Sequence, residues 1–533
     1  KPKKRKDHYD SKFYVRYRKI LTRLLRHPVK TLIIVTLVFF IAMQGFKFIP
    51  NIFFPRNDKA LYTAEFVLPE GTPIHRTESI VKEIEAFMHR NLVAGPDRPE
   101  GIVNWSTYIG QGAPQFYLGY NPEQRKPEYA TMIINTTSNE ITDSLIPKME
   151  EFCLERYPDL RTHIDLLSYG PPTAAVEIRI SGKEISKVFE LADNVKAKLD
   201  SVPGTKNIRD DWGKRTKKIL VRINQARARR AGVTNRDIAI SLQTALTGVE
   251  TTQFREEDKT IPVTLRSSAA EQQDIGKIES INVYAQLTGK NVPLKQVADL
   301  EIEWEPSRIL RRSRLKTVTV KSEVESGVMP MAISQQMDKW LKEESKTWDI
   351  GYKYALGGEI ESSGEANASI GEKMPIAFFI IILLLVFQFN SVRLSVIVLT
   401  TIPLGLIGVV FGLIVARSYF GFMTLLGVIS LAGIVINNAI VLLDRIRIEI
   451  RDFGLEPARA VIEASQKRLR PILLTTATTV GGLIPLWLGG GPMWEPMAIA
   501  IIFGLLFSTV LTLGVVPVLY SIFYRVKYKE FKF

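Results

Sequence analysis

The placement of charged residues constrains this chain more than any other feature of its sequence. Six long stretches contain no Asp, Glu, Lys or Arg: Thr31–Phe46, Met374–Val392, Leu394–Ala416, Ser418–Leu443, Pro471–Trp494 and Pro496–Tyr524. A helix crosses the roughly 30 Å hydrocarbon core of a bilayer with about 20 apolar residues, whereas helices in soluble cores are usually shorter and amphipathic. We therefore predict a six-span α-helical membrane protein, with a first span at 31–50 and a five-span bundle at 374–524.

The basic residues of the short loops predict the orientation of the spans. Lys and Arg are frequent in segment 1–30, between the fourth and fifth spans and in the tail 525–533, whereas the opposite short loops contain only Arg417 and Glu495. Because Lys and Arg near span ends favour the cytoplasm, we expect both termini to be cytoplasmic and segment 1–30 to be basic and amphipathic. This topology explains the net charge of +15, and no motif indicates a nucleic-acid partner.

The segment between the first and second spans is too long for a loop and alternates strands with helices. A strand at Tyr62–Val67 is followed by Thr72-Pro73, which is typical of a helix start. Near the end of the segment, the strand Leu315–Val324, the helix Met331–Leu341 and the strand Ile350–Ala355 follow one another. This pattern predicts a large α+β domain outside the membrane, built of ferredoxin-like βαβ subdomains.

The residue types that most catalytic and metal sites require are scarce. The single cysteine, Cys153, excludes an internal disulfide, and the five histidines include no HxH or HExxH spacing. Gly489–Gly491 resembles a phosphate loop only superficially, because no Lys-Ser or Lys-Thr follows it. We therefore expect no enzyme, no cofactor and no metal centre.

The motifs along the chain resemble one family. One span, a large outer domain and five clustered spans follow the layout of the C-terminal half of a resistance-nodulation-division (RND) multidrug efflux permease of the hydrophobe/amphiphile type. The segments that carry the resemblance are Gly433–Asp444 (GIVINNAIVLLD), Arg468–Thr476 (RLRPILLTT), Gly514–Tyr520 (GVVPVLY), Val67–Thr72 (VLPEGT) and Gly170-Pro171-Pro172. Each is weak alone, but together and in this order they are specific.

The resemblance implies an architecture, a location and partners. It places the chain in a bacterial inner membrane with a periplasmic domain, as part of a trimer that works with a periplasmic adaptor protein and an outer-membrane channel. A second half of the transporter, on the same or another chain, is also implied. The implied domains are porter subdomain 1 at 51–170, porter subdomain 2 at 171–216 with 308–358, and a docking subdomain at 217–307.

The resemblance also implies proton antiport through acidic residues inside the membrane. The charge-free stretches supply none, so we expect the acid to come from the partner half. Asn437 and Asn438 occupy the depth at which well-known drug pumps have a lysine followed by asparagine, and Arg468 and Thr475 match positions implicated in the relay. These residues are our proton-relay candidates. The alternative is ordinary contact between helices, worth about 0.6–2 kcal/mol for each polar pair.

Aromatic residues in the first porter subdomain are candidates for substrate binding. Trp105, Tyr108, Phe116 and Tyr117 lie around Gly110–Gly119, where the resemblance implies a flexible loop beside the drug pocket. Aromatic rings suit a broad apolar ligand, although they are equally consistent with an ordinary core. Metal-exporting relatives line this cleft with methionines, and only Met132 and Met149 lie in the relevant stretch, so we expect export of amphiphiles rather than metals.

Two further expectations concern the spans, and one concerns the function. Gly427, Gly433, Gly481 and Gly482 predict close packing between helices, and Asp444 is expected to form an ion pair with a neighbouring arginine. As alternative functions, the chain is a half-subunit that serves assembly or binding with a partner RND chain without itself transporting, or it takes part in heavy-metal export.

Overall fold

A computed structural model describes residues 11–117, 119–170, 174–213, 215–266, 278–306, 308–325 and 328–528. Pro171 and Pro172 of the predicted motif, the first ten residues of segment 1–30 and the last five of the tail lie outside these ranges. The chain forms two compact units, one made of Lys1–Asp211 with Arg311–Phe533 and the other of Trp212–Leu310.

Within the described ranges, the first unit contains six helices long and apolar enough to cross a membrane, in agreement with the six predicted spans. They are α2 (Pro28–Gly45, extended by a 3₁₀ turn to Phe48), α11 (Glu359–Phe389), α12 with α13 (Val392–Leu399 and Ile402–Val415), α14 (Phe422–Arg451), α15 (Pro457–Gly489) and α16 (Gly491–Phe523). An amphipathic helix, α1 (Lys12–Arg26), precedes α2. Helix α11 begins at Glu359, before the predicted 374, because its helical backbone starts directly after strand β15 (Lys353–Gly358) of the outer domain.

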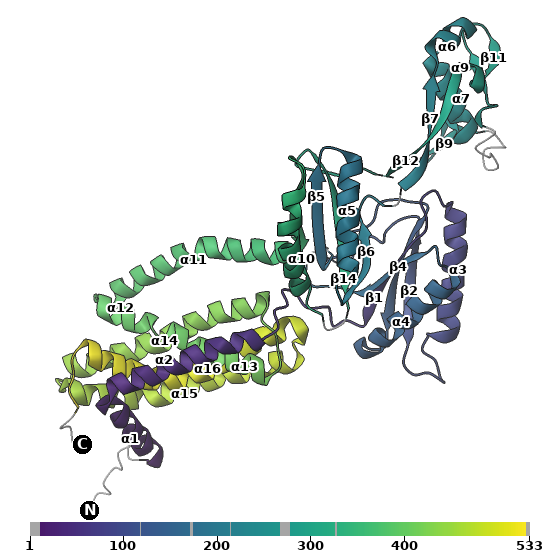
Figure 1. The fold of residues 1–533 in the computed structure, drawn as a ribbon. Coiled ribbons are helices and arrows are strands. Elements are labelled where there is room, and N and C mark those ends of the chain that lie inside the picture. Colours follow the sequence, from purple (N-terminus) through teal and green to yellow (C-terminus); the bar gives the residue numbers. More distant parts are fainter. Residues whose placement is uncertain are drawn as a thin grey trace, which may run out of the picture. The chain divides into compact units, whose positions relative to one another are not determined.

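Helix α16 lies at the centre of the helical bundle and contacts α13, α14 and α15 (Figure 1). Small residues allow the close approach. A Cβ atom at Gly408 of α13 would lie 2.3 Å from the backbone oxygen of Phe503, and one at Gly504 of α16 would lie 2.3 Å from Leu431 of α14. Gly427 also meets the backbone of Met497, as predicted for a packing glycine. Glycines therefore determine how closely the helices approach one another in the core of the bundle.

The first outer sheet has the strand order β2-β3-β1-β4. Its strands are β1 (Leu61–Val67), β2 (Ile102–Ile109), β3 (Tyr129–Thr136) and β4 (Arg161–Leu166), all antiparallel. Helices α3 (Ile74–Asn91) and α4 (Asn139–Arg156) bury their apolar stripes against one face of the sheet. Alternate residues of β1 are buried, so the two faces of this sheet differ in polarity.

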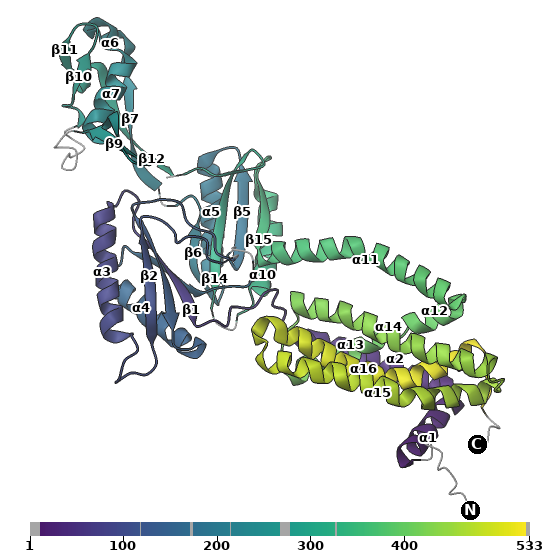
Figure 2. The ribbon, with the colours of Figure 1, turned by 180° about the vertical axis from the view of Figure 1, so that it is seen from behind.

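The second outer sheet repeats this arrangement with a long insertion. The strands β6 (Thr205–Asp210), β14 (Leu315–Val324), β5 (Val176–Gly182) and β15 (Lys353–Gly358) lie side by side in that order, and β13 (Arg311–Arg312) forms a hairpin with β14. Helices α5 (Ile185–Asp200) and α10 (Pro330–Glu344) pack on it (Figure 2). The predicted strand at Ile350–Ala355 begins three residues later, because Gly351 has a φ of 100° that is incompatible with a strand.

The second unit is the segment inserted between β6 and β13. Strands β7 (Arg215–Ile223) and β12 (Ala298–Pro306) pair antiparallel. Around them lie α6 (Gln225–Ala231), α7 (Asn235–Leu246), α9 (Leu294–Val297) and the hairpins β8–β9 (Val249–Glu256, Lys259–Leu265) and β10–β11 (Asn282–Ala285, Lys290–Pro293). Helix α7 begins with a capping box formed by Thr234 and Asp237.

A buried cluster of charges joins the two outer sheets. The Glu323 carboxylate on β14 accepts hydrogen bonds from Arg209 (2.6 Å) and Asn207 (3.0 Å), and lies 2.7 Å from Nδ1 of His163 on β4. Burial by itself would raise the pKa of Glu323, but His163 and Arg209 outweigh it and hold that pKa at about 2. Burial likewise opposes the charge on His163, yet Glu323 raises the pKa of the imidazole. The contact is therefore an ion pair.

The stability of this junction should depend on pH. The contribution of Glu323 is present above its ordinary pKa of 4.5 and is lost as the pH falls through about 2, whereas that of His163 is complete below its ordinary pKa of 6.5 and is lost as the pH rises through its raised value. Glu323→Gln should lower stability by about 1.5–3 kcal/mol and flatten the decline in melting temperature above pH 6.5.

Thermal unfolding of the detergent-purified protein between mildly acidic and mildly alkaline pH checks this prediction. Glu343→Gln is the matched control, because Glu343 pairs with Lys346 on the surface with 75% of its side chain exposed, and exposed pairs contribute little. Equal melting temperatures for Glu323→Gln and Glu343→Gln at every pH would show that the cluster does not hold the sheets together.

Candidate functional site

The first outer sheet has one face without helices, and this face is polar. Strand pairing places Tyr108, Thr131, Glu65 and His163 in one row across β2, β3, β1 and β4. Neighbours in such a row have Cβ atoms about 4.5–5.5 Å apart. The adjacent row on the opposite face contains Ala64, Met132 and Ile164, which belong to the buried core under α3 and α4. The row of Tyr108, Thr131, Glu65 and His163 is called the acidic row below.

Hydroxyl groups around the acidic row are incompletely hydrogen-bonded. The hydroxyls of Tyr129 and Thr131 are buried next to Glu65 without a well-aligned hydrogen bond to any described residue. Burial, and secondarily the negative charge of Glu65, raise the pKa of Tyr120, which places that phenol near the same carboxylate. Oxygen groups here therefore have hydrogen-bonding capacity that the described residues do not use.

The four aromatic candidates do not form a single pocket. Trp105 faces the helices, because its indole Nε1 donates to Glu85 of α3 at 3.1 Å. Tyr108 has the opposite orientation, since it is three residues further along the same strand. Because side chains alternate between the two faces of a strand, the sequence of β2 would have predicted this separation. Trp105 therefore serves the core of the sheet, and Tyr108 belongs to the acidic row.

Phe116 and Tyr117 lie in the connection between β2 and β3. The Phe116 ring is 42% exposed and its centroid lies 5.1 Å from that of Tyr120. The Tyr117 hydroxyl donates to the backbone oxygen of Ser168 at 2.7 Å, which ties this connection to the chain just after β4. Among these rings, Phe116 is the one that presents an apolar surface to solvent or to a ligand.

The four relay candidates lie on α14 and α15. Asn438 is buried, whereas Asn437 and Thr475 are exposed, and the Thr475 hydroxyl donates to Ile472 of its own helix. The Nε atom of Arg468 is buried without a hydrogen-bond partner among the described residues. No hydrogen bond in the described part of the chain links any two of these four residues. Their role in a relay stays a prediction.

Exposed small and polar residues form a stripe on each of these two helices. Ser430, Gly433 and Asn437 on α14, and Thr475, Thr478 and Gly482 on α15, repeat at the same helical spacing and are exposed. A Cβ added at Gly433, Gly481 or Gly482 would have no atom within 4 Å. The prediction that these glycines pack closely is therefore wrong within this chain. These six residues are called the open stripes below.

Sequence analysis missed a buried carboxylate at the predicted cytoplasmic end of α14. The Glu449 side chain is fully buried and lies 2.7 Å from Arg445 and 2.6 Å from Lys467 of α15. The predicted ion pair of Asp444 is replaced by this one, and Arg447 instead donates to the backbone oxygen of Phe389. The length of α14 explains the error, because the helix continues past the charge-free stretch into a charged turn.

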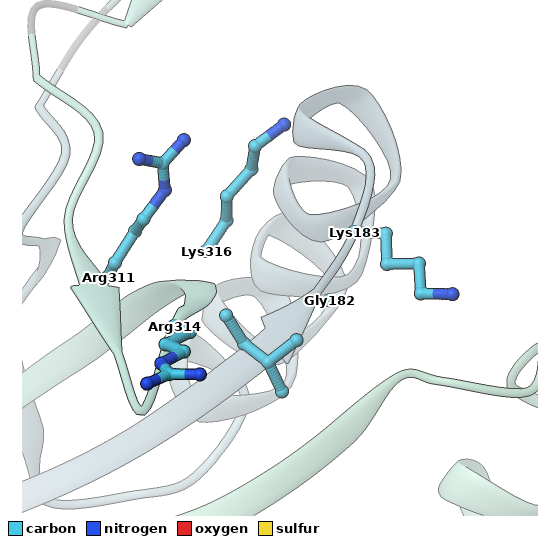
Figure 3. A pocket seen from close by; sticks show the side chains of 6 residues that line it. Gly182, Lys183, Arg311, Arg314 and Lys316 are labelled. Carbon is cyan, nitrogen blue, oxygen red and sulfur yellow. The ribbon is translucent and has the colours of Figure 1, made fainter.

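A pocket of about 400 Å³ lies beside the β13–β14 hairpin, at the end of β5. Its charged lining residues are Lys183, Arg311, Arg314 and Lys316, and Figure 3 shows Arg311 and Lys316 extending in parallel from the hairpin. Four positive charges disfavour a metal cation. Across the described ranges, no three His, Cys, Asp or Glu side chains are arranged to hold a metal ion.

Comparison with known proteins agrees with the family resemblance. The cobalt-zinc-cadmium resistance protein CzcA of Cupriavidus metallidurans is 26% identical over 66% of this chain and 33% of its own length. The nickel and cobalt resistance protein CnrA of the same organism is 23% identical over 90% of this chain and 45% of its own. The swarming motility protein SwrC of Bacillus subtilis is 28% identical over 58% and 29%, respectively.

A solved structure has the same fold. A crystal structure of a heavy metal efflux pump superposes with a TM-score of 0.76 at 20% identity, covering 96% of this chain and 51% of that one. This chain thus spans about half the length of that pump, and less than half of the relatives above. Residues 8–524 match the AcrB/AcrD/AcrF family. Because that match runs through nearly the whole chain, the protein belongs to this family of RND permeases.

Proposed function

We propose that the chain is one half of a proton-motive-force-driven efflux permease in a bacterial inner membrane, with both termini in the cytoplasm. The six apolar helices, with the outer domain inserted between the first and second, support this proposal. The porter ranges 51–170 and 171–216 with 308–358, the docking range 217–307, and assembly as a trimer with an adaptor and an outer-membrane channel are part of the proposal.

The open stripes are the main evidence that this chain requires a second half of the transporter. Membrane helices associate through small residues that allow close approach and through polar side chains that hydrogen-bond across the interface. On α13 and α16 the glycines already serve such contacts, whereas Gly433, Gly481 and Gly482 face open space. Asn437 and Thr475 lie exposed on the same two helices. We infer that helices of the partner half pack here and supply the acidic residue that is protonated.

For the substrate, we infer a divalent transition-metal cation. Glu65 and His163 are adjacent in the acidic row, and carboxylate and imidazole are ligands that such cations accept. The tyrosine and threonine hydroxyls around them have spare hydrogen-bonding capacity. The names of CzcA and CnrA, which refer to cobalt, zinc, cadmium and nickel, favour the same substrate class. Coordination of a metal by His163 would require its ion pair with Glu323 to break.

Export of amphiphilic or hydrophobic compounds is the second candidate. The exposed Phe116 ring beside Tyr120 supports it, because an apolar ring on a connection between strands can adapt to ligands of different shape. A half-subunit that serves only assembly is the remaining alternative, and it predicts no change in export from substitutions in the acidic row.

Substitution of the open glycines tests the partner interface. Gly433→Leu and Gly482→Leu should change the stability of this chain by no more than about 0.5 kcal/mol, because open space surrounds both positions. Each should nevertheless abolish export, since leucine would separate the partner helices. Gly427→Leu is the matched control, because its Cβ would lie 3.0 Å from the backbone of Met497 and should destabilise the chain itself.

Export is measured as resistance in a host strain that lacks the gene and is complemented with each variant, and stability is measured on the purified chain. Wild-type resistance from both Gly433→Leu and Gly482→Leu would mean that these faces contact only lipid, and the proposed interface would be wrong.

A second pair of variants tests the substrate. In the same strain, Glu65→Gln should reduce resistance to zinc, cobalt and nickel salts severalfold while resistance to detergents and dyes is unchanged, because the substitution removes a negative charge from the acidic row. Glu78→Gln is the control, since Glu78 lies exposed on α3 and pairs there with Lys82. If Phe116→Ala alters resistance to detergents and Glu65→Gln alters nothing, amphiphile export is the correct substrate class.

A further inference from the structure

Helix α1 has two faces of different character. One face packs into the bundle: Leu21 and Leu25 are buried, and the Tyr17 hydroxyl donates to the backbone oxygen of Leu513 on α16 at 3.0 Å. The hydroxyl of Thr31 in α2 reaches back to the oxygens of Leu24 and His27. The helix is therefore fixed against the bundle rather than being a loose tail.

The outer face of α1 is a continuous basic stripe. Lys12, Arg16, Lys19 and Arg23 are exposed and recur every three or four residues, which places them on one side of the helix. The sequence of α1 contains no acidic residue, and no carboxylate in the described ranges pairs with any of these four. Phe13 (56% exposed) and Ile20 (53% exposed) lie along one side of the stripe.

The position of α1 directly before a membrane-crossing helix determines its depth relative to the bilayer. Only His27 separates α1 from α2, which begins at Pro28 and is one of the six membrane-crossing helices. At a rise of 1.5 Å per residue, α2 is about as long as the hydrocarbon core is thick. The residues just before Pro28 therefore lie at the boundary between lipid and water, where phosphate headgroups are concentrated.

We propose that the outer face of α1 is a binding surface for the headgroups of anionic phospholipids. The four basic side chains contact lipid phosphates, while Phe13 and Ile20 insert between the acyl chains. An amphipathic helix with basic residues on its polar face and large apolar residues beside them has the composition of an interfacial helix, and each basic residue at an anionic surface adds to the binding. Because α1 contacts α15 and α16, bound lipid also stabilises the bundle.

The test uses the full-length protein with phosphatidylglycerol and phosphatidylcholine as probes. Native mass spectrometry counts the lipids retained from mixed micelles, and thermal unfolding in nanodiscs of each lipid measures the stabilisation. The wild type should retain phosphatidylglycerol in preference to phosphatidylcholine and melt at a higher temperature with it. Replacing Lys12, Arg16, Lys19 and Arg23 together by Gln should reduce that preference about tenfold or more.

Two controls keep the result specific. A variant with Gln at Lys82, Lys295, Lys342 and Lys346 removes the same charge from exposed sites of the outer domains and should keep the preference. If the variant with four Gln residues in α1 does not fold, Arg16→Lys with Arg23→Lys retains the charge and should bind as the wild type does.

Three outcomes would overturn the proposal. The wild type could retain the two lipids equally, the outer-domain control could lose the preference as fully as the α1 variant, or inorganic phosphate could reproduce the stabilisation in phosphatidylcholine. The last result would identify a site for soluble anions rather than for lipids. Export activity does not enter this test, so a failure here leaves the proposed function unaffected.

Discussion

The close contact of α16 with α13 and α14 is the interaction on which the structure depends. Lipid offers no hydrophobic gain for bringing membrane helices together, so van der Waals contact and polar pairs must hold them. Gly408 and Gly504 let the helix backbones approach until a Cβ atom would overlap with the neighbouring helix. Thr476 and Thr509 add a hydrogen bond between α15 and α16 at 2.8 Å. The bundle is therefore closed on this side.

The other sides of the bundle have no neighbouring helix in the described part of this chain. The residues exposed there bear on its function. Polar residues on exposed membrane helices are costly unless another helix covers them, and small residues are enriched where membrane helices pack together. Helices α14 and α15 carry such residues in the open stripes, while α2 and α11 expose mainly large apolar residues such as Phe40 and Phe379. Two kinds of surface follow, one suited to lipid and one suited to partner helices.

The sheets of the outer domain also have one covered face and one face that contacts a partner. Helices cover one face of the first sheet, and the other face carries the acidic row and joins the second sheet through His163 and Glu323. A buried charge on a sheet needs a partner, and here the partner comes from the neighbouring sheet. His163 thus belongs both to the contact that joins the sheets and to the residues proposed to receive the substrate, so binding and relative movement of the sheets would be coupled.

Much of the fold follows from simple patterns in the sequence. Charge-free stretches predicted the apolar helices, and the strand expected at Tyr62–Val67 lies within β1. Glu449 was missed because the charge pattern ends a span at its first charged residue, whereas the helix continues. The grouping of Trp105 with Tyr108 failed because proximity along the chain was used where the alternation of a strand separates them. The acidic row depends on pairing register, which no local pattern predicts.

Photo-crosslinking at Asn437 tests the central claim most directly. A benzoylphenylalanine at this position in native membranes, irradiated and analysed by mass spectrometry, reports which molecule lies against the open stripe of α14. The account predicts adducts with a membrane helix, and an acidic residue within that helix. Adducts with lipid alone, at Asn437 and equally at Thr475, would contradict it.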